Sequence, residues 1–91
     1  IIGDFVYNLL ERYVNNLNIE KVKEFALTKN ILFSDEELDF TYKFIKKNWQ
    51  DILANHGMFD INRYQSHYSE ENFKKLVLVY KEALQKYSTY L

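Results

Sequence analysis

Apolar residues recur along most of this chain three or four positions apart, which is the spacing of an amphipathic helix and not that of a half-buried strand. The spacing predicts four main helices, at about residues 4–16, 19–29, 35–56 and 70–88, and a short helix near residues 60–67. The first of them has a broad apolar stripe made of Phe5, Val6, Leu9, Leu10, Tyr13 and Leu17. We therefore expect an all-α fold, a small array of four main helices in a single domain over residues 1–91.

The predicted helix over residues 35–56 has the clearest signals at its two ends. Ser34 and Glu37 have the spacing of a capping box, in which each side chain accepts a hydrogen bond from a backbone N–H at the helix start. Gly57 is suited to end the helix in the left-handed conformation. The main apolar stripe between these signals contains Leu38, Tyr42, Ile45, Trp49, Ile52, Leu53 and His56.

Two further aromatic residues of this helix, Phe40 and Phe44, lie one turn apart and nearly opposite the main stripe. Neighbouring rings of this kind are usually covered, because contiguous apolar surface is rarely left in water. We favour the interpretation that a second element of the same chain covers them, which makes 35–56 the central helix of the fold. The alternatives are that a partner chain covers the two rings or that they are exposed.

Charge and cysteine content limit the classes of partner. The 12 basic and 13 acidic residues give a net charge of -1, so no bulk positive field attracts nucleic acid or an anionic membrane. The chain has no cysteine, which excludes disulfides and cysteine ligands of zinc and fits a cytoplasmic protein. No apolar run is long enough to span a membrane, and the start at Ile1 leaves open a segment upstream of it.

Few residues in the chain are candidates for chemistry. His56, Asp60 and His67 could in principle surround a metal ion, but Gly57 interrupts the helical register that would align the first two. The acidic residues at the start of the central helix complement its dipole, an interpretation we prefer to a cation site; they are Asp35, Glu36, Glu37 and Asp39. We expect no enzyme activity, no catalytic residue, no metal and no cofactor.

Two successive helices between Ile19 and Lys47 could be mistaken for a DNA-reading helix-turn-helix. The start of the second helix is acidic, however, and phosphates would repel it. Lys43, Lys46 and Lys47 form a modest basic patch further along. We therefore keep a nucleic-acid-associated protein that uses this patch only as the alternative function.

Several short sequence segments from Leu17 onward carry a resemblance to a known protein family. They are Leu17-Asn18-Ile19-Glu20, Phe25-Ala26, Asn30-Ile31-Leu32-Phe33-Ser34 and Phe59-Asp60. In these phrases the chain resembles the YqfT-like family of small uncharacterised proteins from Bacillus-related bacteria. It departs from that pattern in having Tyr68-Ser69-Glu70 in place of a proline beside the last cap, and in a longer first helix. The resemblance implies a helical cytosolic protein and brings no activity or catalytic residue with it.

The leading functional hypothesis is a protein-interaction or self-associating module. It rests on Phe40 and Phe44 and on Leu78 and Val79, which fall off the main stripe of the last helix. The predicted interaction surface consists of Phe40, Phe44, Lys47, Leu78 and Val79. The expected partner is a protein or a second copy of the chain, with nucleic acid unlikely and no membrane.

Overall fold

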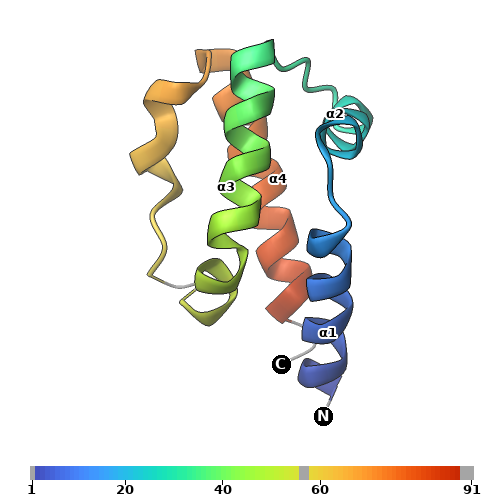
Figure 1. Cartoon of the computed structure of the whole chain (residues 1–91). Helices are drawn as coiled ribbons and strands as arrows, with labels where there is room; N and C mark the ends of the chain where they lie inside the picture. Colours follow the sequence, from blue (N-terminus) through green and yellow to red (C-terminus); the bar gives the residue numbers. More distant parts are fainter. Residues whose placement is uncertain (1, 56–57, 89–91) are drawn as a thin grey trace.

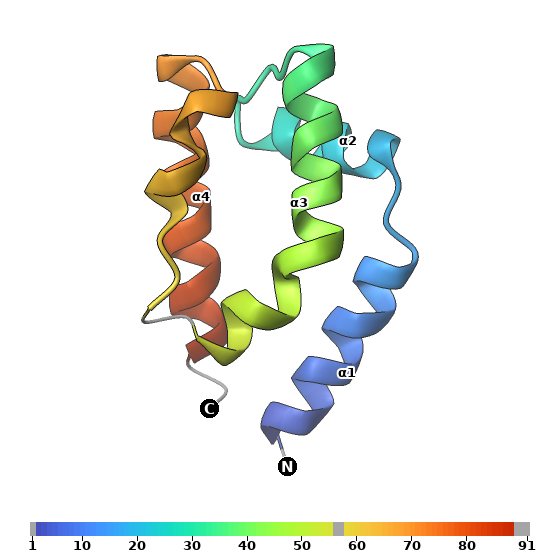
Figure 2. The same ribbon diagram turned by 60° about the vertical axis from the view of Figure 1, so that its left-hand side comes forward.

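The computed structural model describes residues 2–55 and 58–88 of the chain, and the side chains of 4–55 and 58–86. It contains helices α1 (Ile2–Asn15), α2 (Ile19–Thr28), α3 (Asp35–Ala54) and α4 (Glu70–Ser88), with the 3₁₀ helix η1 (Ile61–His67) before the last of them. No strand occurs in these described ranges, and the all-α prediction is confirmed. Helices α3 and α4 stand beside each other, with η1 on one flank and α1 and α2 on the other (Figures 1 and 2).

The predicted helix boundaries differ from the observed ones by at most two residues. Helix α1 begins at Ile2 instead of residue 4, and the short helix predicted near residues 60–67 is η1. Helix α3 ends at Ala54 with Asn55 as its C-cap, and the Asn55 carbonyl accepts the backbone N–H groups of Met58 and Phe59 at 2.8 and 2.9 Å. The predicted last residue and stop of this helix, residues 56 and 57, lie outside the described residues.

Helix α2 ends in a Schellman motif, with Asn30 where glycine is more usual. Asn30 has a φ of 62°, which asparagine tolerates better than most residues with a β-carbon. The N–H of Asn30 donates to the carbonyl of Leu27 at 3.0 Å, and that of Ile31 to the carbonyl of Ala26 at 2.9 Å. Because Lys75 of α4 donates to the Asn30 carbonyl at 2.8 Å, this helix end is also tied to α4.

The tightly packed core is small and lies where α2 crosses α3. Leu17, Val22 and Leu38 form a buried cluster there, and Tyr42 and Ile45 of α3 pack against it. The other buried apolar residues are Val14, Ala26, Ile31, Ile61 and Phe73. Towards the other end of the molecule α1 still contacts α3, because the Tyr7 and Trp49 ring centroids lie 5.2 Å apart and the side-chain amide of Gln50 donates to the Tyr7 hydroxyl at 2.9 Å.

Candidate functional site

The second face of α3 is covered by η1 and the residue that follows it. The Phe40 ring stacks on His67 with centroids 3.9 Å apart and meets Tyr68 edge-on at 5.8 Å. The Phe44 ring packs against Tyr64 at 4.8 Å. Both phenylalanines are half-buried. A segment of the same chain therefore covers the two rings, which is the alternative that we favoured from the sequence.

Phe59 extends this set of rings to helix α4. Its ring lies 5.9 Å from Phe44, 5.9 Å from Tyr64 and 6.1 Å from Tyr80. Each such aromatic pair stabilises by about 0.5–1.5 kcal/mol beyond the area it buries. We call the whole set the aromatic layer; its members are Phe40, Phe44, Phe59, Tyr64, His67, Tyr68 and Tyr80. The aromatic layer packs η1 against α3 and links it through Phe59 to Tyr80 of α4.

The five residues of the predicted interaction surface do not form one patch. Phe40 lies in the aromatic layer, and Phe44 belongs both to that layer and, with Val79, to the wall of a cavity. Leu78 is 68% exposed, and Lys47 is also exposed. The predicted surface around Phe40 and Phe44 is therefore largely internal, because η1 folds back over it. A 3₁₀ helix lacks the 3.6-residue period that would have revealed this packing in the sequence.

Two lysines of the predicted basic patch are engaged in contacts within the chain. The Lys43 ammonium lies 3.0 Å from the carboxylate of Asp39, one turn earlier on α3. The Lys46 ammonium donates to the backbone carbonyl of Asn15 at 3.4 Å. Lys47 is exposed. The Asp39 carboxylate offsets the positive charge of Lys43, whereas the bond from Lys46 to a neutral carbonyl leaves the charge of Lys46 in place.

The residues considered for a metal site have other local roles where they are described. The His67 ring packs on Phe40, and the Asp60 carboxylate caps η1 by accepting the N–H of Asn62 at 3.0 Å. The third candidate, His56, lies outside the described residues. Within the described ranges, no group of three or more histidine, cysteine or acidic residues is placed to hold a metal ion.

Glu37 is a buried carboxylate that joins the start of α3 to the start of α4. It is 7% exposed. One of its oxygens, Oε1, accepts the N–H of Ser34 and the side-chain amide of Asn72, each at 2.8 Å. The other, Oε2, accepts the N–H of Ser69 at 2.7 Å. Ser34 and Ser69 cap the two helices with their hydroxyls, so Glu37 links both caps, whereas the sequence predicted only the bond between Glu37 and the Ser34 cap.

The charge of Glu37 is stabilised by these donors. Burial raises the pKa of the Glu37 carboxyl, but the hydrogen bonds from Ser34, Ser69 and Asn72 lower it by more, so the pKa lies below its ordinary value. The N-terminal ends of α3 and α4 favour a negative charge in the same place. Because both oxygens are occupied by donors of the chain, we assign Glu37 a structural role and not one in acid or base chemistry.

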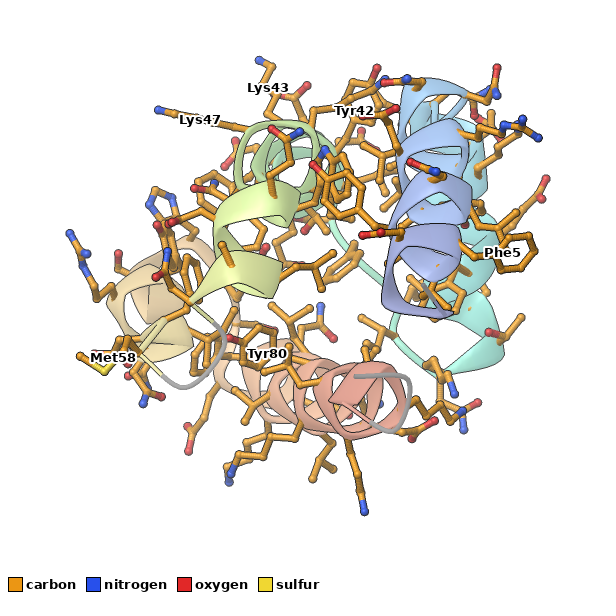
Figure 3. The ribbon with its side chains drawn as sticks, turned by 90° about the horizontal axis from the view of Figure 1, so that it is seen from below. Phe5, Tyr42, Lys43, Lys47, Met58 and Tyr80 are labelled. Atoms are coloured by element: carbon orange, nitrogen blue, oxygen red, sulfur yellow. The ribbon has the colours of Figure 1, made fainter. Side chains whose placement is uncertain are left out.

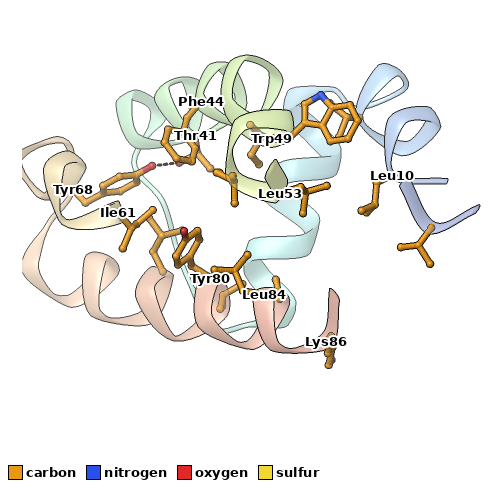
Figure 4. Close-up of a pocket in the computed structure, with 17 residues that line it drawn as sticks. Leu10, Thr41, Phe44, Trp49, Leu53, Ile61, Tyr68, Tyr80, Leu84 and Lys86 are labelled. Atoms are coloured by element: carbon orange, nitrogen blue, oxygen red, sulfur yellow. Dashed lines mark hydrogen bonds between the residues drawn. The ribbon is translucent and has the colours of Figure 1, made fainter. Parts of the chain in front are cut away.

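A cavity of about 490 Å³ opens between α1, α3 and α4 (Figures 3 and 4). Its walls are almost wholly apolar, with Val6, Leu10 and Val14 from α1, Ile45, Trp49, Ile52 and Leu53 from α3, and Leu76, Val79 and Leu84 from α4. Ligand-binding pockets typically have volumes of about 300–1,000 Å³. Sequence reasoning missed the cavity, because an apolar stripe looks the same whether its residues pack together or line a space.

Two tyrosines of the cavity wall differ in how their hydroxyls are satisfied. The Tyr68 hydroxyl is bonded to the Thr41 hydroxyl at 2.7 Å (Figure 4), whereas the Tyr80 hydroxyl is buried with no hydrogen-bond partner among the described side chains. Burial raises the pKa of both tyrosines, and the charge of Asp60 raises that of Tyr80 further, so both are neutral at pH 7.

We expect Tyr80→Phe to increase the free energy of unfolding by about 1 kcal/mol, because it removes a buried hydroxyl that has no partner within residues 4–55 and 58–86. The matched change Tyr68→Phe is expected to decrease it by about 1 kcal/mol, because it breaks a bond and leaves the Thr41 hydroxyl with one partner fewer. Urea denaturation measures both values. Effects of the same sign in the two variants would contradict this assignment.

The outward side of α1 carries a row of large apolar residues. Phe5, Leu9 and Tyr13 are 65%, 47% and 53% exposed, and their spacing of four residues places them on one helix face. Figure 3 shows Phe5 directed away from α3 and α4. We call these three residues the α1 outer stripe. The sequence predicted one broad core stripe on this helix, and that stripe included these three residues. Only the remaining residues of the stripe face the rest of the molecule, because α3 and α4 lie on one side of α1.

Three comparisons, with protein families, with curated proteins and with solved structures, found no match to this chain. The resemblance to the YqfT-like family stays a prediction. In the described part of the chain, no helix combines the length and the apolar character needed to cross a membrane.

Proposed function

We propose that this protein is a self-associating interaction module that uses the α1 outer stripe. The observation that carries the proposal is the row of three large, exposed apolar side chains on one helix face. Single exposed apolar residues are ordinary on protein surfaces, but a contiguous patch is typical of an interaction site. Residues spaced one turn apart are also the usual anchors when one helix packs on another.

A second copy of the chain suits this row because the row is self-complementary. If a two-fold axis passes near Leu9, an antiparallel α1 of the other copy places its Tyr13 against Phe5 and its Leu9 against Leu9. Within the described side chains of α1 the ionic residues are Asp4, Glu11 and Arg12. This helix therefore has no excess of positive charge, which favours a protein partner over nucleic acid.

The proposal moves the interaction surface away from Phe40 and Phe44, whose rings are half-buried by the aromatic layer. It keeps the other parts of the hypothesis drawn from the sequence. We propose a cytoplasmic location, supported by the lack of cysteine, and membership of the YqfT-like family, supported by the phrases from Leu17 onward. Neither of these proposals brings an enzymatic activity.

Sedimentation velocity over a wide range of concentrations tests the self-association. We expect the wild-type chain to shift from monomer to dimer as its concentration rises, and a Phe5→Ser, Leu9→Ser double variant to remain monomeric. The free energy of unfolding of the monomer should change by only about 0.5 kcal/mol, because both side chains are exposed. Leu78→Ser is the matched control, since Leu78 is similarly exposed on α4. A wild type that stays monomeric throughout would overturn the proposal.

A further inference from the structure

The cavity between α1, α3 and α4 is lined by apolar side chains that the rest of the chain leaves partly uncovered. Most of the large apolar residues of its wall are half-buried and not buried, among them Leu10, Trp49, Ile52 and Val79. Water inside proteins usually makes about three hydrogen bonds to polar groups, which these walls do not offer. In a complete core such side chains meet a further layer of side chains. The cavity therefore resembles a core that lacks one side.

The chain also exposes more surface than a folded monomer of its size. Monomeric proteins of 11.1 kDa expose about 5,700 Å² by the general relation between surface and mass. This chain exposes 6590 Å², which is an excess of about 900 Å² over that relation. A standard protein interface covers about 800 Å² on each partner. The excess is therefore close to the area that one partner of ordinary size covers.

The α1 outer stripe is too small to be the whole of such an interface. An aromatic side chain buries about 150–250 Å² when it is fully covered, and Phe5, Leu9 and Tyr13 are only 65%, 47% and 53% exposed. Together they supply about 300 Å² on each copy, whereas a specific interface needs at least about 500 Å² on each. Self-association through the stripe therefore requires neighbouring apolar surface as well.

The cavity wall on α1 is continuous with the α1 outer stripe. Val6 and Leu9, like Leu10 and Tyr13, are three residues apart, and residues at this spacing are neighbours on a helix surface. On the other flank of this wall the Tyr7 ring packs on an aromatic ring of α3, with centroids 5.2 Å apart. The order around α1 is therefore the contact with α3, the cavity wall and the outer stripe. A partner that covers the stripe consequently lies beside the cavity, opposite its wall on α4 (Figure 3).

Symmetry then brings the two cavities together. A two-fold axis carries each surface of one copy onto the same surface of the other. When the two outer stripes meet, the two cavities face each other, with α4 of each copy at the far edge. We propose that self-association closes the cavity, so that the dimer buries apolar walls that neither copy covers alone. This inference rests on the proposed self-association, and it adds the cavity walls on α3 and α4 to the interface.

Trp49 reports the closure directly, because it lines the cavity and is the only tryptophan in the sequence. We expect its emission to shift to shorter wavelength, and its quenching by acrylamide to decrease, over the range of concentration in which sedimentation velocity shows the wild-type chain to dimerise. The Phe5→Ser, Leu9→Ser double variant should show neither change. If the wild type dimerises while the emission and quenching of Trp49 stay constant, closure of the cavity is wrong and self-association still stands.

Two residues of α4 provide a matched pair of variants. Ala83 lines the cavity and Leu78 does not, although both are exposed in the single chain. Ala83→Glu should weaken dimerisation by about tenfold or more, because closure would bury a charge among apolar walls. Leu78→Glu should leave dimerisation unchanged. Both positions are exposed, so each variant is expected to fold, which circular dichroism checks.

The results separate this inference from the proposed function. If the α1 double variant is monomeric but Ala83→Glu dimerises as the wild type does, the outer stripe associates without closing the cavity, and only the inference is overturned. If the wild type stays monomeric at every concentration, both are overturned. Dimerisation that is lost in both variants and kept in Leu78→Glu, together with the shift in Trp49 emission, supports both.

Discussion

Replacement of Glu37 by alanine is expected to lower the free energy of unfolding by about 3–5 kcal/mol. The change leaves the part-buried N–H groups of Ser34 and Ser69 and the buried amide of Asn72 without their acceptor, and a buried donor without a partner costs about 1–3 kcal/mol. Small domains have a total stability of only about 5–15 kcal/mol. Urea denaturation followed by circular dichroism measures the loss. Glu36→Ala is the matched control in the same helical turn, because Glu36 is exposed, and should change stability by about 0.5 kcal/mol or less.

Acid should reveal the same carboxylate in the wild-type protein. The pKa of Glu37 is lower in the folded chain than its ordinary value of 4.5. The charged form therefore contributes stability that is fully present above pH 4.5 and is lost as the pH falls from there through the folded-state pKa. Glu37→Gln cannot ionise, so the difference in stability between the wild type and this variant should shrink as the pH is lowered over that range. A difference that is independent of pH would show that the charge of Glu37 is not involved.

The second large effect is expected for Phe40→Ala, which should lower the free energy of unfolding by about 3 kcal/mol. The change removes a half-buried ring that contacts His67, Tyr64 and Tyr68, and truncating a buried phenylalanine to alanine typically costs about 3–5 kcal/mol. Thermal and urea denaturation measure the loss, and near-ultraviolet circular dichroism reports the loosening of the tyrosines. Phe5→Ala is the control, because Phe5 is 65% exposed.

The result for Phe40 also distinguishes packing from partner binding. If Phe40→Ala is as stable as the wild type but no longer associates with a partner, the ring belongs to an interaction surface and the aromatic layer does not hold η1. If the variant loses stability as a monomer, the ring stabilises the fold. We expect the second result, because η1 packs an aromatic ring against Phe40 and another against Phe44.

Several features were predictable because their signals lie within a few residues of one another. The Ser34 and Glu37 capping box is present as expected, since its two halves are separated by a single turn. The start of α4 at Ser69 has the same local origin. The outward position of Phe5 was not predictable, because α1 is apolar on two sides and its sequence does not show which side meets the rest of the chain.

The candidate sites depend on contacts between distant segments. The link from Glu37 to Ser69 and Asn72 spans more than thirty residues of sequence, and no local pattern records it. The cavity beside Trp49 likewise depends on the relative positions of three helices. Some residues of these sites, such as Glu37 and Trp49, were recognised in the sequence as cap or core residues, but their shared surroundings were not.

The sequence by itself determined the all-α class, the approximate helix boundaries and the presence of a second apolar face on α3. These properties follow from helical period and from caps, which act over three or four residues. Only the tertiary structure decided that η1 covers Phe40 and Phe44, that Glu37 joins two helices, and that a cavity lies beside Trp49. The physical reason is that burial of apolar surface is non-directional: the period of a helix shows which face is apolar, but packing selects what covers it.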